Sequence, residues 1–149
     1  MSSRPDESGF FVRLASWDRD RDALSGVRIR VFVEEQGVPE SLEWDREDAR
    51  AVHLLAVDAV SRPIGTARLL DTGQIGRMAV LPDWRNRGVG RALLRGILEI
   101  AQQRAVPQPF LNAQTSALPF YRRMGFVPVG EEFEEAGIPH RKMILGDRT

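Results

Sequence analysis

The chain has 149 residues, enough to bury the core of one domain and too few for two. Its 21 basic residues balance 21 acidic ones, so its net charge predicts neither a nucleic acid nor a membrane as partner. The absence of cysteine excludes a disulfide framework and a thiolate nucleophile, and the absence of a long apolar segment or signal peptide predicts a soluble, cytoplasmic protein.

The polar N-terminus precedes the first predicted element. Residues 1–9 are expected to form a disordered tail, and a single domain is expected to occupy residues 10–149. Aromatic and β-branched residues predict a first strand at residues 10–14.

A long helix is predicted next. Asp18 is a candidate cap for a helix over residues 19–35, whose apolar face carries Leu24, Val27 and Val31. Gly37 ends this helix, and an acidic loop that contains Trp44 follows at residues 40–50.

The middle of the chain changes to a strand pattern. Three apolar segments, residues 52–57, 64–70 and 75–81, are separated by short turns and predict an antiparallel meander. A helix over residues 88–104 follows, because apolar residues recur at helical spacing at Val89, Leu93, Ile97, Ile100 and Ala101.

The last third completes the sheet. A strand at residues 110–114 is reached by a helical crossover, so it should be parallel to its neighbour. Ser116 is a candidate cap for a short helix at residues 118–124, and strands at residues 127–133 and 140–145 follow. The order β-α-β-β-β-α-β-α-β-β predicts an α/β fold on a mixed, mostly antiparallel sheet.

The strongest functional signal lies between the third strand of the meander and the long helix. Two glycines there allow the backbone to approach a ligand closely, and the free N–H groups of the first helical turn attract an anion such as a diphosphate. Three arginines add positive charge to the same segment, which comprises Arg85, Asn86, Arg87, Gly88, Val89, Gly90 and Arg91.

The spacing differs from that of two common phosphate loops. A dinucleotide fingerprint requires a third glycine, and a P-loop requires Gly-Lys-Ser/Thr. The pattern R-x-x-G-x-G at residues 85–90 instead resembles the acyl-CoA signature of the GNAT N-acetyltransferase superfamily. FYRRMGF at residues 120–126 is similar to another motif of that superfamily, and residues 31–39, 111–114 and 137–143 resemble its YjcF/ElaA-like branch.

The resemblance implies a GNAT-like fold and an acetyl-CoA-dependent N-acetyltransferase that moves the acetyl group to a small amine by direct attack. It places coenzyme A on the loop at residues 85–91. The pantetheine chain is expected to pair, like an added strand, with Met78, Ala79 and Val80. Asn112, Phe120 and Tyr121 complete the predicted coenzyme site.

The resemblance also supplies a candidate acid. The Tyr121 phenol stays protonated at neutral pH and can donate a proton to the leaving thiolate, with core packing as its alternative role. The base is open, because no carboxylate lies on the strand where some GNAT enzymes have a glutamate. His53 and Glu34 are predicted catalytic residues, with His140 or Glu35 as alternatives, and the two histidines lack the spacing of a metal site.

The predicted acceptor site is the least specific part of the analysis. It comprises Glu34, Glu35, Arg68, Arg77, Gln114 and His140. The resemblance implies that the helix end at residues 33–36 and the acidic loop at residues 40–48 form one wall of the acceptor cleft, with His140 and Glu131 on the opposite wall. A cleft walled by carboxylates favours a cationic amine. Arg68 and Arg77 lie in apolar strands and should pair with Glu34, Glu35, Glu43 or Asp45; a free arginine would instead favour an acceptor that also carries a carboxylate or phosphate.

Two rival functions share part of this pattern. The segments around Phe32, Asp45 and Arg68 also resemble acyl-homoserine-lactone synthases, which have the same core. A non-catalytic acyl-CoA-binding module would keep the loop and tolerate loss of Tyr121. The sequence leaves the acyl length and the oligomeric state open, a homodimer included.

Overall fold

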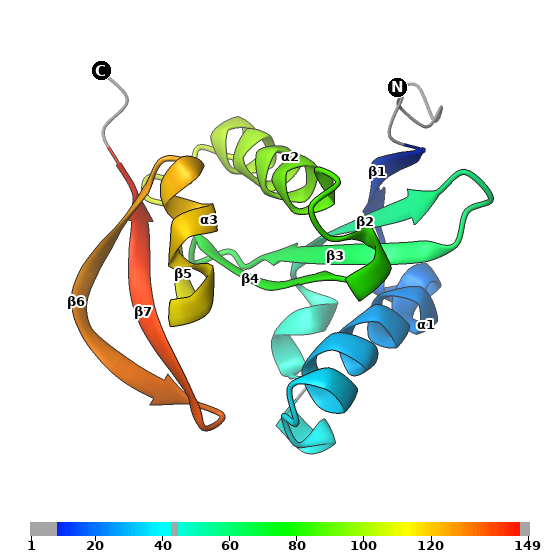
Figure 1. The fold of residues 1–149 in the computed structure, drawn as a ribbon. Helices are drawn as coiled ribbons and strands as arrows, with labels where there is room; N and C mark the ends of the chain where they lie inside the picture. The colour runs from blue at the N-terminus through cyan, green and yellow to red at the C-terminus, as the bar shows by residue number, and fades with distance from the viewer. Residues whose placement is uncertain (1–8, 43–44, 147–149) are drawn as a thin grey trace.

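The computed structural model describes residues 9–42 and 45–146. Its centre is a seven-stranded sheet in the order β1-β2-β3-β4-β5-β7-β6, seen in Figure 1. Neighbouring strands are antiparallel except β4 and β5, which are parallel as predicted. The predicted mixed α/β fold is confirmed. The predicted tail, Gly9 excepted, lies outside the described residues, as do Glu43 and Trp44.

The elements follow the predicted order with small shifts at their ends. The strands are β1 (Phe10–Ala15), β2 (Val52–Asp58), β3 (Pro63–Leu69), β4 (Gln74–Val80), β5 (Phe110–Gln114), β6 (Phe126–Glu135) and β7 (Ile138–Leu145). The α-helices are α1 (Trp17–Arg28), α2 (Val89–Gln103) and α3 (Leu118–Arg123), and α1 continues as a π-helical segment, η1 (Ile29–Glu35). Short 3₁₀ turns are η2 (Glu40–Leu42), η3 (Arg46–Ala49), η4 (Pro82–Trp84) and η5 (Thr115–Ala117).

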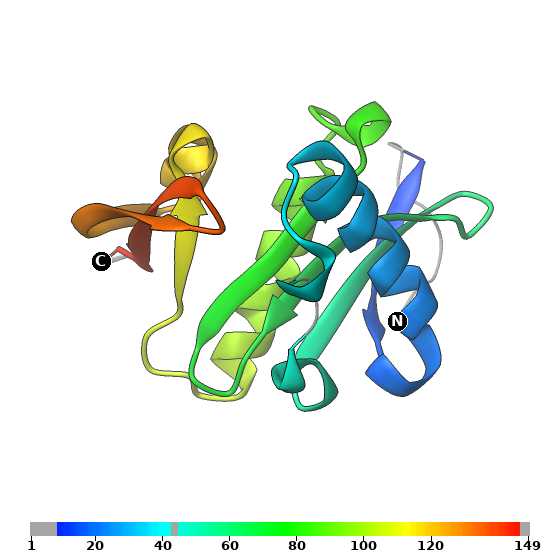
Figure 2. The same cartoon turned by 90° about the horizontal axis from the view of Figure 1, so that it is seen from below.

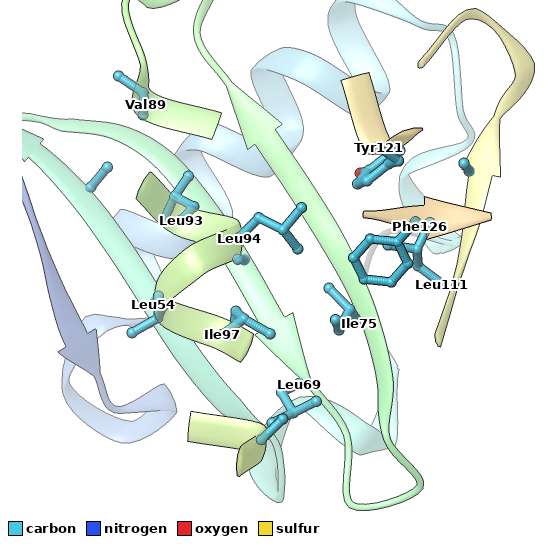
Figure 3. Packing of buried hydrophobic residues seen from close by; sticks show 14 of the residues in the cluster. Leu54, Leu69, Ile75, Val89, Leu93, Leu94, Ile97, Leu111, Tyr121 and Phe126 are labelled. Carbon is cyan, nitrogen blue, oxygen red and sulfur yellow. The ribbon is translucent and has the colours of Figure 1, made fainter. Parts of the chain in front are cut away.

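Helices cover both faces of the sheet. Figures 1 and 2 show α2 and α3 on one face and α1 with η1 on the other. The main core lies under α2 and α3, where Leu93, Leu94 and Ile97 are fully buried against the strands (Figure 3). Burying each such side chain contributes about 1.5–3 kcal/mol, so the apolar stripe anchors α2 to the sheet. None of the described helices is long and apolar enough to span a membrane.

Both predicted helix caps are wrong. Helix α1 begins after Ser16 rather than Asp18, and the carboxylate of Asp20 accepts a hydrogen bond from the Ser16 N–H at 2.8 Å. Helix α3 begins after Ala117, because residue 116 lies inside the 3₁₀ turn η5. The acceptor for the Ser16 N–H thus comes from Asp20 inside the first turn, where a negative charge also interacts favourably with the helix dipole.

The single predicted helix over residues 19–35 changes its winding after Arg28. Three β-branched residues, Ile29, Val31 and Val33, alternate in η1 and crowd a regular α-helical turn. Val31 is buried and packs against β4 at Ala79. The wider turn therefore keeps η1 on the sheet; π-helical turns often occur at functional sites.

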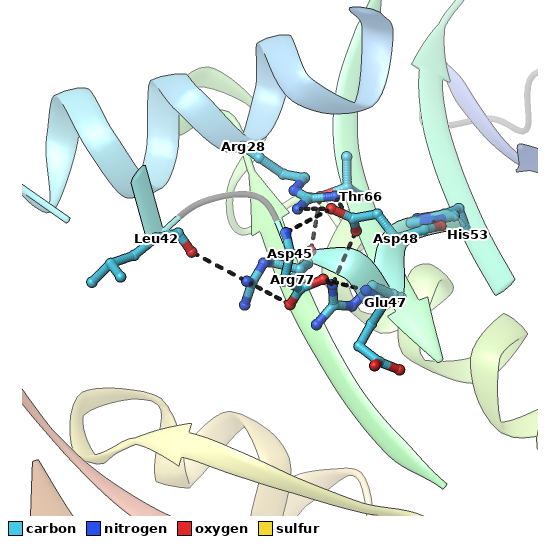
Figure 4. A network of polar contacts seen from close by, with 9 residues as sticks. Arg28, Leu42, Asp45, Glu47, Asp48, His53, Thr66 and Arg77 are labelled. Atoms are coloured by element: carbon cyan, nitrogen blue, oxygen red, sulfur yellow. Dashed lines mark hydrogen bonds and ion pairs between the residues drawn. The ribbon is translucent and has the colours of Figure 1, made fainter. Parts of the chain in front are cut away.

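A buried ion network joins the helical layer to the sheet (Figure 4). Arg28 of α1 donates two hydrogen bonds to the Asp48 carboxylate, at 3.0 and 3.1 Å, and both side chains are 1% exposed. Arg68 of β3 donates to Asp48 at 3.0 Å and to Asp45 at 2.8 Å. Burial acts to raise the pKa of Asp48, but the hydrogen bonds and charges of the two arginines outweigh it and lower that pKa.

We expect Asp48→Asn to lower the free energy of unfolding by about 3–5 kcal/mol at pH 7, because it leaves two buried guanidinium groups without their shared carboxylate. Since the folded pKa of Asp48 lies below its ordinary value, its contribution is complete at neutral pH and is lost as the pH falls through the folded pKa. Urea unfolding at several pH values measures both effects. Asp22→Asn, at an exposed position of α1, is the control and should change stability by less than about 0.5 kcal/mol. Equal stability of the two variants at pH 7 would contradict this role of Asp48.

Candidate active site

The candidate site is built around the divergence of two parallel strands. Strands β4 and β5 are paired at only two positions, Gln74 with Phe110 and Ile75 with Leu111. Figure 2 shows the strands separating beyond these pairs. Arg77 lies in an irregular part of β4 with a φ of 48°, and the Thr66 hydroxyl donates to its carbonyl at 2.8 Å. The later part of β4 therefore has an edge that β5 does not pair.

The predicted anion loop leads from this edge into α2. Gly88 is the residue before the helix and has a φ of 89°, and no side chain caps the N–H groups of the first turn. Asn86 also has a positive φ, at 62°, a conformation that asparagine tolerates better than most residues. Arg87 stacks on Trp84 with its guanidinium 4.1 Å from the ring centre, and Arg91 is exposed. The loop thus presents uncapped N–H groups between cationic side chains.

Arg85 is held by the protein itself. Its guanidinium donates two hydrogen bonds to Glu35 at the end of η1, at 2.6 and 2.7 Å, and its Nε donates to the Val80 carbonyl at 3.0 Å. The hydrogen bonds from Arg85 lower the pKa of the Glu35 carboxyl. The predicted cofactor residue Arg85 and the predicted acceptor residue Glu35 are therefore partners of each other.

Tyr121 lies on the α2 and α3 side of the divergent strands. It is 9% exposed and packs edge-on against Phe120 and Phe126. Burial raises the pKa of its phenol to about 12. Phe120 lies beside Gly90, where a Cβ would be 3.4 Å from its ring, so the two motifs of the sequence meet here. Figure 3 shows the Tyr121 oxygen on the side of the ring toward β4.

Polar side chains line the opposite, η1 face of the same strands. The Gln114 amide donates to the Gln36 side-chain oxygen at 2.9 Å, which links the end of β5 to the end of η1. His140 is directly opposite Gln114 in the β5–β7 ladder, and Lys142 is opposite Asn112. Side chains of directly opposed residues share one face of a sheet. These four residues therefore face the η1 side, away from Tyr121.

Three other predicted site residues have partners within the protein. His53 is 1% exposed, stacks on Trp17 and has its Nε2 2.8 Å from the Asp48 carbonyl. Burial lowers the pKa of His53. Arg68 and Arg77 both contact Asp45, one of the predicted partners. The condition for an anionic acceptor, an arginine free to face the cleft, is thus not met.

Sequence reasoning missed three contacts that shape the site. Gln36 is separated from Gln114 by 78 positions, and no local pattern indicates their contact. The Thr66 hydroxyl supports Arg77 across a strand pair whose register the sequence did not predict. The contact of Asp48 with the arginines could have been predicted, because two arginines in apolar strands need more than the single carboxylate of Asp45.

Comparison with known proteins identifies the family to which a chain with this loop and these strands belongs. The family model described as "Acetyltransferase (GNAT) domain" matches residues 20–146. The chain belongs to the GNAT acetyltransferase family. Membership of this family identifies the protein as an acyltransferase. It also supports a coenzyme A thioester as the cosubstrate.

Individual relatives confirm the predicted branch. YjcF of Bacillus subtilis, named an uncharacterized N-acetyltransferase, is 37% identical over 122 residues, which cover 79% of this GNAT chain and 86% of that protein. Protein ElaA of Escherichia coli is 34% identical over 125 residues, covering 79% and 82%. The crystal structure of ElaA superposes with a TM-score of 0.80 over 90% of this chain and 98% of its own.

Other solved structures extend the likeness. An acyl-CoA N-acyltransferase from Pseudomonas aeruginosa has a TM-score of 0.80 and 29% identity, covering 91% of this chain and 98% of its own. The acyl-homoserine lactone synthase BjaI has a TM-score of 0.71, covering 92% and 84%, but only 21% identity. Its likeness shows the shared fold and does not extend to the reaction.

The Arg85–Glu35 pair yields a prediction for coenzyme A binding. We expect Glu35→Gln to bind coenzyme A about two- to fivefold more tightly, because the diphosphate no longer competes with a carboxylate for Arg85; a half-exposed ion pair is worth up to about 1 kcal/mol. Calorimetric titration measures the affinity. Asp83→Asn is the control, since it removes a negative charge beside the loop without touching Arg85. An equal gain in coenzyme A affinity in both variants would mean that any lost negative charge has this effect. It would contradict competition between Glu35 and the diphosphate for Arg85.

Proposed function

We propose that this protein transfers an acetyl group from acetyl-CoA to the primary amine of a small molecule, by direct attack of the amine on the thioester within a ternary complex. One observation carries the proposal. The divergence of β4 and β5 opens between an uncapped helix N-terminus with two positive-φ residues before it and a tyrosine buried on the same face.

The donor site follows from the chemistry of each segment. The N–H groups of Val89, Gly90 and Arg91 would hold the diphosphate, with Asn86, Arg87 and Gly88 shaping the loop. The unpaired edge of β4 at Met78, Ala79 and Val80 would bind the pantetheine amides as an added strand would, and Asn112 and Phe120 would border it. Arg85 would join this site once it leaves Glu35 and the Val80 carbonyl.

Tyr121 is the proposed acid. As the amine attacks, the carbon–sulfur bond breaks and the electron pair leaves with sulfur, which needs a proton. A phenol with a pKa near 12 remains protonated at neutral pH and can donate to the thiolate. Its burial beside Phe120 and Phe126 supports this role, because those rings fix its orientation.

The acceptor is proposed to be cationic. Glu34 and Glu35 at the end of η1 are exposed, as is Glu131 on β6, and these carboxylates would attract a cationic acceptor. Arg68 and Arg77 are engaged by Asp45 and offer no site for a second, anionic group of the acceptor. Gln114 and His140, which are opposite each other in the β5–β7 ladder, would contact the reacting amine. His53 is left out because its ring is buried against Trp17 and Asp48.

A screen of acceptors tests the function. Polyamines, amino acids, amino-sugar phosphates, alcohols and thiols are incubated with acetyl-CoA, and release of coenzyme A is measured. We expect acceptor-dependent release with polyamines and other cationic amines. Activity confined to alcohols or thiols would contradict an N-acetyltransferase, and binding of coenzyme A with no acceptor-dependent release would indicate an acyl-CoA sensor.

Replacement of the only tyrosine tests the acid. Tyr121→Phe removes one hydroxyl and keeps the ring that packs against Phe120 and Phe126. We expect kcat to fall by about 10²–10⁴-fold while the affinity for coenzyme A stays the same. Single-turnover measurements ensure that chemistry limits the observed rate. Wild-type kcat under those conditions would refute the assignment of Tyr121 as the acid.

A further inference from the structure

The second histidine has surroundings unlike those of His53. His140 of β7 is 6% exposed, and its ring stacks on Phe133 of β6 at a centroid distance of 5.9 Å. On its other side it is opposite Gln114, whose amide contacts Gln36. The imidazole is thus held in place on the acceptor side of the divergent strands.

Hydrogen bonding sets which ring nitrogen carries the proton. The Nδ1 atom of His140 lies 2.6 Å from the Ile138 carbonyl oxygen. A carbonyl oxygen can only accept a hydrogen bond, so Nδ1 must be the protonated nitrogen of the neutral ring. The Nε2 atom therefore keeps its lone pair and can accept a proton.

A carboxylate faces that lone pair. The Glu135 carboxylate of β6 lies 3.8 Å from Nε2, and its side chain is 57% exposed. Both groups are acceptors while the ring is neutral, whereas protonation of Nε2 makes them an ion pair. Phe133, which stacks on the ring, is neutral, and Lys142 on the same face of β7 places its Nζ over the Phe110 ring instead.

We propose that His140 is the base that takes the proton of the acceptor amine, and that Glu135 is a positioning residue that stabilises the resulting imidazolium. The inference rests on the proposed N-acetyltransferase function. As the nitrogen–carbon bond forms and the carbon–sulfur bond breaks, one amine proton moves to Nε2 of His140 and the Tyr121 proton moves to sulfur. The imidazolium then releases its proton to water beside the exposed Glu135, and the phenolate of Tyr121 regains a proton from solvent.

Nuclear magnetic resonance tests the pair without requiring turnover. With two histidines in the chain, the His140 signals are assigned by their loss in His140→Gln. We expect ring nitrogen chemical shifts of the Nδ1–H tautomer, and a change in the Nε2 chemical shift in Glu135→Gln but not in the control Glu134→Gln, whose side chain points to the other face of β6. An Nε2–H tautomer, or equal shifts in both glutamate variants, would overturn the pairing.

Kinetics test the catalytic role with an amine that the wild-type protein acetylates. We expect kcat to fall by about 10²–10⁴-fold in His140→Gln and by a smaller factor in Glu135→Gln, with KM for the amine unchanged in both and neither constant changed in Glu134→Gln. Should His140→Gln not fold, Glu135→Gln still decides the question. An active wild-type protein whose kcat is unchanged in His140→Gln and Glu135→Gln overturns this inference alone, whereas a wild-type protein that acetylates no amine overturns the proposed function as well.

Discussion

The short pairing of β4 with β5 is the constraint on which the site depends. Two opposed residue pairs hold the strands together at one end, and the backbone irregularity at Arg77 then turns the edge of β4 away from its neighbour. A continuous sheet here would satisfy every backbone group and leave no room for an extended ligand. The divergence instead leaves an unpaired edge that runs toward the helix α2 N-terminus, and it separates a face with Tyr121 from a face with Gln114 and His140. Acid and proposed base thus lie on opposite sides of the same opening.

The second face exists only because η1 is held over β4. The ion network of Arg28, Asp48 and Arg68 fixes the helical layer at one end, and Val31 packs on Ala79 at the other. A buried ion pair is costly to desolvate, and its loss of one partner costs more than its formation gains. Such a network therefore adds little to the net stability of the fold, but it permits only one position of the helical layer on the sheet. The position of Glu35 and Gln36 at the end of η1 follows from that placement.

Much of the fold and the donor loop could be predicted from local patterns. The strand at residues 110–114 was predicted with its observed ends, because a crossover helix and an apolar run define both of them. The loop before α2 was predicted because glycines and arginines before a helix carry a local chemical meaning. The predicted helix caps failed at Asp18 and Ser116, since α1 begins after Ser16 and α3 after Ala117 and neither of these residues caps its helix with a side chain. A local capping pattern therefore did not mark where either helix begins.

The acceptor face was less predictable because its residues meet only in the folded chain. The sequence favoured His53 over His140 as the base. Cross-strand register instead pairs His140 with Gln114, whereas His53 contacts the Asp48 carbonyl. Likewise, the alternation of residues along a strand indicates which side chains share a face of the sheet. It does not indicate which helix or loop packs on that face.

A crystal structure of the protein with acetyl-CoA tests the central claim most directly. The account predicts the diphosphate on the N–H groups of Val89, Gly90 and Arg91, the pantetheine chain along Met78 to Val80, and the sulfur near the Tyr121 hydroxyl, with Arg85 turned away from Glu35. A pantetheine chain bound anywhere other than between β4 and β5 would contradict it.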